Sequence, residues 1–193
     1  MIDTDRDIKS RKAKALDAIR KLSHFWKNNK TPIKTKVKIF SALVGSIFLY
    51  NAYLWSMNST RDGQIDAFQR RLLRYAIDIS WPRKINNIAL YNMTRQVPWS
   101  KIIAYRRLCW FGHMTRLPDD TPVKHALREM ETEVRKPRGR PKTTWLGGMK
   151  AQLENDLGMS WGQAVDCATD RDCWKGKIAK FRPQWAEVPG KRR

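Results

Sequence analysis

The chain has 193 residues, 41% of them hydrophobic, which is enough for one ordinary domain or two small ones and excludes wholesale disorder. Its 39 lysines and arginines against 18 aspartates and glutamates give a formal net charge of +21. So large an excess opposes compaction and is typical of proteins that bind a polyanion, with nucleic acid ahead of an anionic membrane surface. A basic surface without a function is the remaining alternative.

The N-terminal part of the chain is predicted to be helical. Apolar residues at three- and four-residue steps predict an amphipathic helix over about residues 5–28, and Pro32 follows it as a helix breaker. Residues 39–57 carry no charge and are long enough for a membrane span. Four polar residues interrupt that stretch: Ser41, Ser46, Asn51 and Ser56. We therefore expect a buried core helix and no membrane partner, with a membrane span as the alternative.

Further helices are expected after this apolar stretch. Ser59 or Thr60 is the predicted N-cap of a helix that runs to about residue 77. Asn86 is the predicted N-cap of a short helix that ends near residue 93. Pro98 is typical of the first turn of a helix, which we expect to reach about residue 117.

Residues 135–142 differ in composition from the rest of the chain, with five basic residues, two prolines, one glycine and no acid. This composition predicts a basic linker. After it we expect a small helical unit over 143–182, with Ser160 and Asp170 as N-caps, and a basic tail over 183–193. No segment alternates apolar and polar residues as a strand does. The predicted fold is therefore all-α, with a helical bundle over 1–130 before the linker.

Basic residues beside the apolar stripes, and those of the linker, are the candidate contacts to phosphate groups. Together they predict a continuous positive surface. The candidates are Lys34, Lys36, Lys38, Arg70, Arg71, Arg74, Arg106, Arg107, Arg135, Lys136, Arg138, Arg140 and Lys142. The sequence RGRP at 138–141 also looks like an AT-hook. Binding in the minor groove of DNA and a nuclear-import signal are thus alternatives to general phosphate or RNA contact.

No catalytic pattern is recognisable in the sequence. Polymerase chemistry needs carboxylates clustered around two metal ions, and the only adjacent pair of aspartates, Asp119 and Asp120, lies in a predicted turn. No P-loop, G-x-S-x-G or H-E-x-x-H pattern occurs. We therefore expect no enzymatic activity and no cofactor.

The cysteines are sparse and odd in number. The chain has only three, and so small and odd a number favours a reducing, intracellular compartment and argues against a disulfide framework. Cys109 and His113 have the i, i+4 spacing that places two metal ligands on one helix face, and Cys167 with Cys173 would complete a four-ligand zinc site. A chain without a metal site is the favoured alternative.

Several motifs follow one another in a recognisable order. They are KTKVKIF at 34–40, IDAFQRRLLR at 65–74, RRLCWFGHMTRLPDD at 106–120, GRPKTTW at 139–145 and ATDRDCW at 168–174. In order and spacing they resemble LINE-type (non-LTR) retrotransposon reverse transcriptases, of the jockey-like and RTE-like kind, in the region that follows the polymerase palm. Where that family often has Y-G-x-E-x-W, this chain has YNAYLW at 50–55. The loss of the glycine and the glutamate indicates drift after truncation, or a new use.

The resemblance implies a thumb-like helical region with a C-terminal extension, parts that grip template RNA and the primer–template duplex in target-primed reverse transcription. It also implies that the catalytic aspartates lie elsewhere. We expect a nucleic-acid-binding fragment of a reverse transcriptase, located in the nucleus, the cytoplasm or both. Its expected partners are RNA, RNA–DNA hybrid or DNA, with other parts of a reverse transcriptase. The alternative is a truncated or domesticated remnant that acts as a protein-interaction or assembly module.

Overall fold

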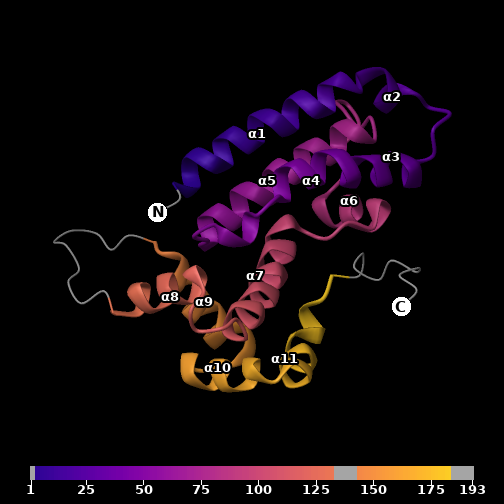
Figure 1. Cartoon of the computed structure of the whole chain (residues 1–193). Coiled ribbons are helices and arrows are strands. Elements are labelled where there is room, and N and C mark those ends of the chain that lie inside the picture. The colour runs from indigo at the N-terminus through magenta and orange to yellow at the C-terminus, as the bar shows by residue number, and fades with distance from the viewer. Residues whose placement is uncertain (1–2, 133–142, 184–193) are drawn as a thin grey trace.

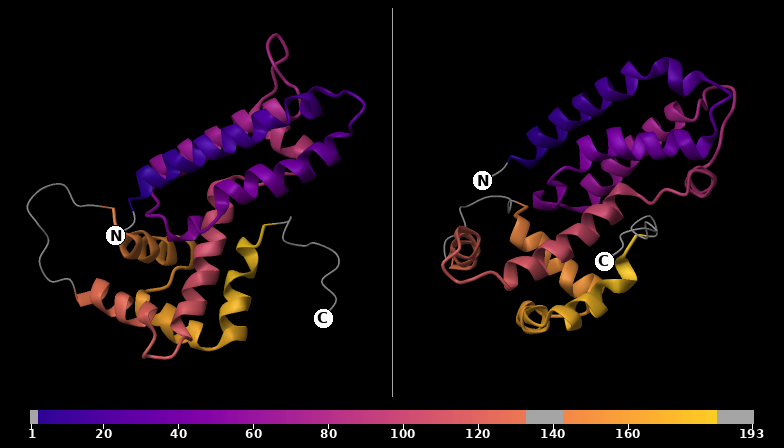
Figure 2. Two further views of the ribbon diagram at one scale, coloured as in Figure 1. Left: turned by 45° about the horizontal axis from the view of Figure 1, so that its top comes forward. Right: turned by 45° about the vertical axis from the view of Figure 1, so that its right-hand side comes forward.

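The computed structural model describes residues 3–132 and 143–183, which form an all-α fold, as the sequence predicts. The helices make two groups, and α7 (Trp99–Thr115) runs from one group to the other (Figures 1 and 2). In the first group α1 runs alongside α4 and α5, while in the second group α10 and α11 pack on the far half of α7.

The first group opens with α1 (Thr4–Lys21), whose N-cap Asp3 accepts a hydrogen bond from a backbone N–H of the first turn at 3.2 Å. One residue separates α1 from α2 (Ser23–Lys27), so the single helix predicted for this segment is in fact two. At this break the indole Nε1 of Trp26 donates to the carbonyl oxygen of Ile19 at 2.7 Å. The indole thereby satisfies a carbonyl near the end of α1.

The remaining helices of the first group precede α7. They are α3 Ile33–Phe40, the π-helical turn η1 Ser41–Gly45, α4 Ser46–Leu49, the 3-10 turn η2 Ala52–Leu54, α5 Ser59–Ala76 and α6 Asn87–Thr94. The N-cap of α5 is Asn58, whose Oδ1 accepts the backbone N–H of Arg61 at 2.9 Å, and not Ser59 or Thr60 as predicted. The prediction of Asn86 as the N-cap of α6 is confirmed.

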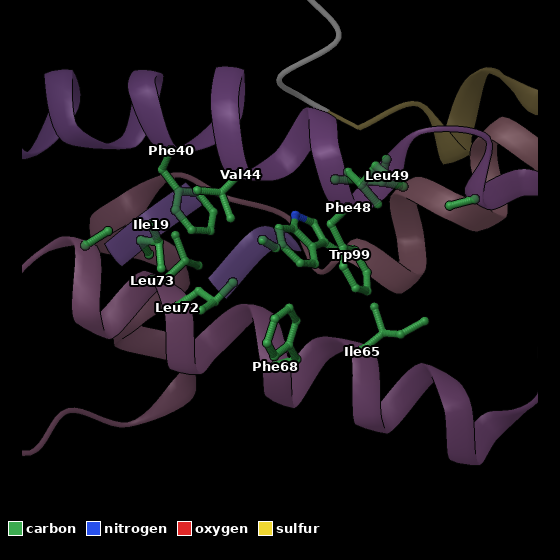
Figure 3. Close-up of a cluster of buried hydrophobic side chains, with 14 of the residues drawn as sticks. Ile19, Phe40, Val44, Phe48, Leu49, Ile65, Phe68, Leu72, Leu73 and Trp99 are labelled. Carbon is green, nitrogen blue, oxygen red and sulfur yellow. The ribbon is translucent and has the colours of Figure 1, made fainter. Parts of the chain in front are cut away.

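Aromatic rings fill the centre of the first core (Figure 3). The indole of Trp99 stacks on Phe48 with ring centroids 4.6 Å apart and on Phe40 at 6.0 Å. Phe68 of α5 packs against the same indole at 6.3 Å. Each of these side chains is buried, and burial of a side chain of this size stabilises a fold by about 1.5–3 kcal/mol. Three segments that are distant in sequence, α3 to α4, α5 and α7, are thus held together.

The segment Ile33–Leu54 is long and apolar enough to cross a membrane, judged by length and composition. In this fold one side of it packs into the first core, through Val37, Phe40, Val44, Phe48 and Leu49. The other side is open and mixes polar groups with Leu43, which is 44% exposed. Packing in the core therefore accounts for the uncharged stretch seen in the sequence.

The second group packs on the C-terminal half of α7. It consists of α8 Pro122–Thr132, α9 Trp145–Gln152, the π-helical turn η3 Leu153–Leu157, α10 Trp161–Thr169, α11 Arg171–Ile178 and the 3-10 turn η4 Ala179–Phe181. The ring of Phe111 lies 5.1 Å from that of Trp161 and 5.2 Å from that of Trp174. Ser160 and Asp170 cap α10 and α11, as predicted.

Both cores share α7. Its first turns place Trp99, Ile102 and Ile103 in the first core, and its later turns place Leu108 and Phe111 in the second. The change from one core to the other therefore falls inside a continuous helix. The linker predicted at 135–142 lies outside the described residues, as does all but the first residue of the predicted tail.

Candidate nucleic-acid interface

A groove of about 640 Å³ lies between α1 and α2 on one side and α5 on the other. Trp26 and Leu72, both buried, contribute apolar surface to its lining. Tyr75 of α5 adds a phenol ring that is 41% exposed. We call this feature the α1–α5 groove, and its basic residues are Arg20, Lys27, Arg71 and Arg74.

The α1–α5 groove has a strongly positive lining. Its four basic side chains face a single acid, Asp78. Arg20, Lys27 and Arg71 are exposed, and none of them forms an ion pair with a carboxylate within residues 3–132 and 143–183. Cations that outnumber the acids around a hollow focus a positive potential there. Such a groove attracts the phosphates of a polyanion.

Helix geometry explains how the cations of α5 reach the groove. Arg71 and Arg74 are three residues apart, so they share one face of the helix. The guanidinium of Arg74 is fixed, because its Nη2 donates to the carbonyl of Ile85 at 3.2 Å and to Oδ1 of Asn87 at 2.8 Å. Opposite them, Arg20 lies in the last turn of α1, where the helix dipole favours a cation.

Other predicted cations lie elsewhere on the surface. Arg70, next to Arg71 in sequence, hydrogen-bonds the phenol of Tyr91; burial raises the pKa of that phenol and this bond opposes the rise. Lys34 and Lys38 are exposed on α3 but do not line the α1–α5 groove. The linker cations, Arg135, Lys136, Arg138, Arg140 and Lys142, lie outside the described residues.

Two of the predicted surface cations are buried, which corrects the sequence-based assignment. Lys36 is 4% exposed, and its Nζ donates to the backbone carbonyl of Trp26. Arg107 is also 4% exposed, and its Nε and Nη2 have no hydrogen-bond partner in the described chain. Burial lowers the pKa of Arg107 to about 10, although Asp62 and Asp156 favour its charge. Neither side chain is in a position to contact a ligand on the surface.

Arg106 also lies outside the α1–α5 groove. It is half-buried, and its Nη1 donates to the carbonyl of Leu49 at 2.9 Å. Leu49 is the last residue of α4, and its carbonyl therefore has no hydrogen-bond partner within that helix. Burial lowers the pKa of Arg106. The side chain therefore ties α7 to the end of α4 and does not extend the α1–α5 groove.

The cysteines form a pair that the sequence did not predict. Cys167 of α10 and Cys173 of α11 form a disulfide, because the turn between the helices brings their Cα atoms to 5.9 Å. Cys109 stays a free thiol. In the described residues, no group of three or more His, Cys, Asp or Glu side chains is placed to hold a metal ion. The zinc site considered for Cys109, His113 and the disulfide pair is therefore not formed.

No protein-family model, curated protein or solved structure matches this chain. The resemblance to reverse transcriptases therefore rests on the sequence motifs alone.

Sequence reasoning found half of the basic lining of the α1–α5 groove. Arg71 and Arg74 stand in a conspicuous cluster, whereas Arg20 and Lys27 were passed over because each lies near a helix end among many other basic residues. No local signal distinguishes these two residues, because Lys38 also follows a buried residue, Val37, without lining the groove.

Proposed function

We propose that this chain binds nucleic acid through the α1–α5 groove, as a thumb-like fragment of a non-LTR retrotransposon reverse transcriptase without a catalytic centre of its own. The observation that carries the proposal is the gathering of Arg20, Lys27, Arg71 and Arg74 around one hollow in a chain of net charge +21. The motif order described above supports the family. Template RNA or an RNA–DNA duplex is the proposed ligand.

The chemistry of the groove suits a phosphate backbone better than a small anion. Its cations come from three helices, α1, α2 and α5, so they are distributed around the lining of the groove. A nucleic-acid strand presents evenly spaced phosphates, and each one that is neutralised releases counterions and adds affinity. The fixed guanidinium of Arg74 gives one preset contact, while Arg20, Lys27 and Arg71 are free to adjust.

A charge-reversal experiment tests the groove. Arg20→Glu combined with Arg71→Glu should weaken binding of a labelled RNA–DNA hybrid by at least about tenfold in an anisotropy titration, because two phosphate contacts become repulsive. Both side chains are exposed and make no ion pair within the described residues, so the fold should tolerate the change. Circular dichroism and a melting curve would verify this.

The matched control is Lys175→Glu with Lys177→Glu on α11, two exposed positions outside the groove. This pair changes the net charge by the same amount, and screening at physiological salt confines its field to about 8 Å. We expect binding close to that of the unmodified chain. Equal losses for the two double variants would contradict the proposal and indicate a response to total charge. Competition with single-stranded RNA, duplex RNA and A·T-rich DNA then ranks the ligands.

A further inference from the structure

A second hollow, of about 540 Å³, lies where the end of α4 and the turn after it meet α7. Its residues differ from those of the α1–α5 groove, and aromatic rings dominate it. We call it the aromatic pocket and define it by Tyr50, Asn51, Tyr53, Arg106, Trp110 and His113. Its volume falls in the range of small-molecule sites, about 300–1,000 Å³.

The rings of the aromatic pocket form a connected surface. The centroid of Tyr53 lies 5.2 Å from that of Trp110, and the centroid of Trp110 lies 5.4 Å from that of His113. Tyr50 stands beside them with 67% of its surface exposed. A large aromatic side chain so open to water gains nothing from core packing. It is available to stack on a flat ligand.

The backbone that carries Tyr50 and Tyr53 is held in place before any ligand binds. Asn51 adopts a left-handed conformation, with φ 49°, which turns the chain sharply after α4. Arg106 then bonds the carbonyl of Leu49 on one side of this turn, and the indole Nε1 of Trp145 donates to the carbonyl of Tyr53 at 2.8 Å on the other. A preorganised platform loses little conformational freedom on binding.

The charges around the aromatic pocket decide what kind of flat ligand fits. Its lining includes the cation Arg106 and, among the described residues, no carboxylate. Outside the lining, Arg11, which forms an ion pair with Asp7 at 2.9 Å, lies over the ring of Tyr50 at 5.7 Å from its centroid. Asn51 has an amide NH2 to offer to the edge of a ring, because Tyr53 bonds only its Oδ1, and Ser46 has its hydroxyl oxygen, because that hydroxyl donates to the carbonyl of Ala42. Aromatic platforms with nearby cations are the chemistry that binds unpaired bases and their phosphates.

We propose that the aromatic pocket binds one unpaired nucleobase of a single-stranded nucleic acid, with Tyr50 as a stacking platform. This site shares no lining residue with the α1–α5 groove. A base already paired and stacked inside a duplex does not expose its faces. The pocket therefore discriminates single strands from duplexes.

Cys109 gives a direct measure of occupancy, because it lines the aromatic pocket and is the free thiol of the chain. Burial raises the pKa of this thiol, so it alkylates slowly at neutral pH and the rate is easily followed by mass spectrometry. A trinucleotide is a suitable probe for the full chain. We expect it to slow alkylation of Cys109 several-fold, whereas an abasic trinucleotide with the same phosphates should not.

The variant Tyr50→Ala tests the stacking residue. It should weaken protection of Cys109 by the trinucleotide by about tenfold, because stacking of a base on one ring is lost. Tyr50→Phe keeps the ring and should behave like the unmodified chain. Trp81→Ala removes another exposed aromatic ring, 83% exposed and outside the pocket, and serves as the matched control. The groove variant, Arg20→Glu with Arg71→Glu, should leave protection unchanged, which separates this site from the groove.

Two results would overturn the assignment. One is equal protection of Cys109 by the normal and the abasic trinucleotide, which would show that phosphates alone are bound. The other is protection that survives Tyr50→Ala undiminished, which would place the base elsewhere. Failure of the α1–α5 groove to bind a duplex would not bear on the aromatic pocket, because the trinucleotide assay does not depend on the groove.

Discussion

Gly112 of α7 and Trp174 of α11 approach so closely that a Cβ atom on residue 112 would lie 2.3 Å from Cδ1 of the indole. Trp174 is 2% exposed, and its Nε1 donates to the carbonyl of Leu108 at 3.0 Å. Displacing the ring would therefore break this hydrogen bond and disturb the packing around it. The absence of a side chain at Gly112 is what lets α11 pack on α7 and close the second core.

Gly112→Ala should destabilise the protein by about 1–3 kcal/mol, because overpacking forces the indole or a helix to shift. The free energy of unfolding in urea measures this. The control is Gly63→Ala on α5, where no atom lies within 4 Å of the added Cβ and helix propensity predicts a gain of about 0.5–1 kcal/mol. A gain at both positions would show that the two helices are not in close contact.

Arg107→Met should stabilise the protein by about 1–3 kcal/mol at pH 7. The variant removes buried guanidinium nitrogens that have no hydrogen-bond partner in the described chain and replaces them by an apolar group of similar length. Differential scanning calorimetry of the two proteins checks the sign. A loss of stability would mean that attraction by Asp62 and Asp156 outweighs the desolvation of the charge.

The same variant has a defined pH dependence. Burial lowers the folded-state pKa of Arg107 from its ordinary value to about 10, so the charge opposes folding at any pH below about 10. That penalty fades as the pH rises above about 10 toward the ordinary pKa of arginine. The stability difference between Arg107→Met and the unmodified chain should therefore shrink from pH 8 to pH 11. A difference that grows over this range would contradict the assignment of the penalty to this charge.

Reduction of the disulfide between Cys167 and Cys173 should lower the free energy of unfolding by about 2 kcal/mol, the loop-entropy value for so short a loop. Melting with and without a reducing agent measures it. Cys167→Ser with Cys173→Ser should melt like the reduced chain and respond no further to the reagent. Thiol titration supplies the independent check: one thiol, Cys109, is expected in the folded oxidised protein, and three would contradict the pairing.

Local signals in the sequence predicted local features well. Asn86, Ser160 and Asp170 were identified as N-caps because a capping side chain bonds a backbone group only two or three residues away. Helical periodicity likewise gave the all-α class. The break after α1 was missed, because it depends on the indole of Trp26 reaching back to Ile19, a contact across seven residues.

Burial of charge was not predictable from the sequence. Lys36 resembles the exposed Lys34 and Lys38 in its local sequence, and Arg107 resembles the half-buried Arg106. Each is nevertheless enclosed by residues of other helices: the carbonyl of Trp26 lies beside Lys36 and the backbone of Gly148 beside Arg107. The α1–α5 groove has the same origin. It exists because α1 and α5 pack together, and no local pattern links Arg20 to Arg71.

The salt dependence of binding tests the central claim most directly. We predict that the logarithm of the dissociation constant of an RNA–DNA hybrid rises linearly with the logarithm of salt concentration, with a slope that indicates about four neutralised phosphates. Affinity should then fall roughly 100-fold between about 50 and about 200 mM salt. Arg20→Glu with Arg71→Glu should reduce this slope by about two. A slope near zero, or one unchanged by the groove variant, would contradict the account.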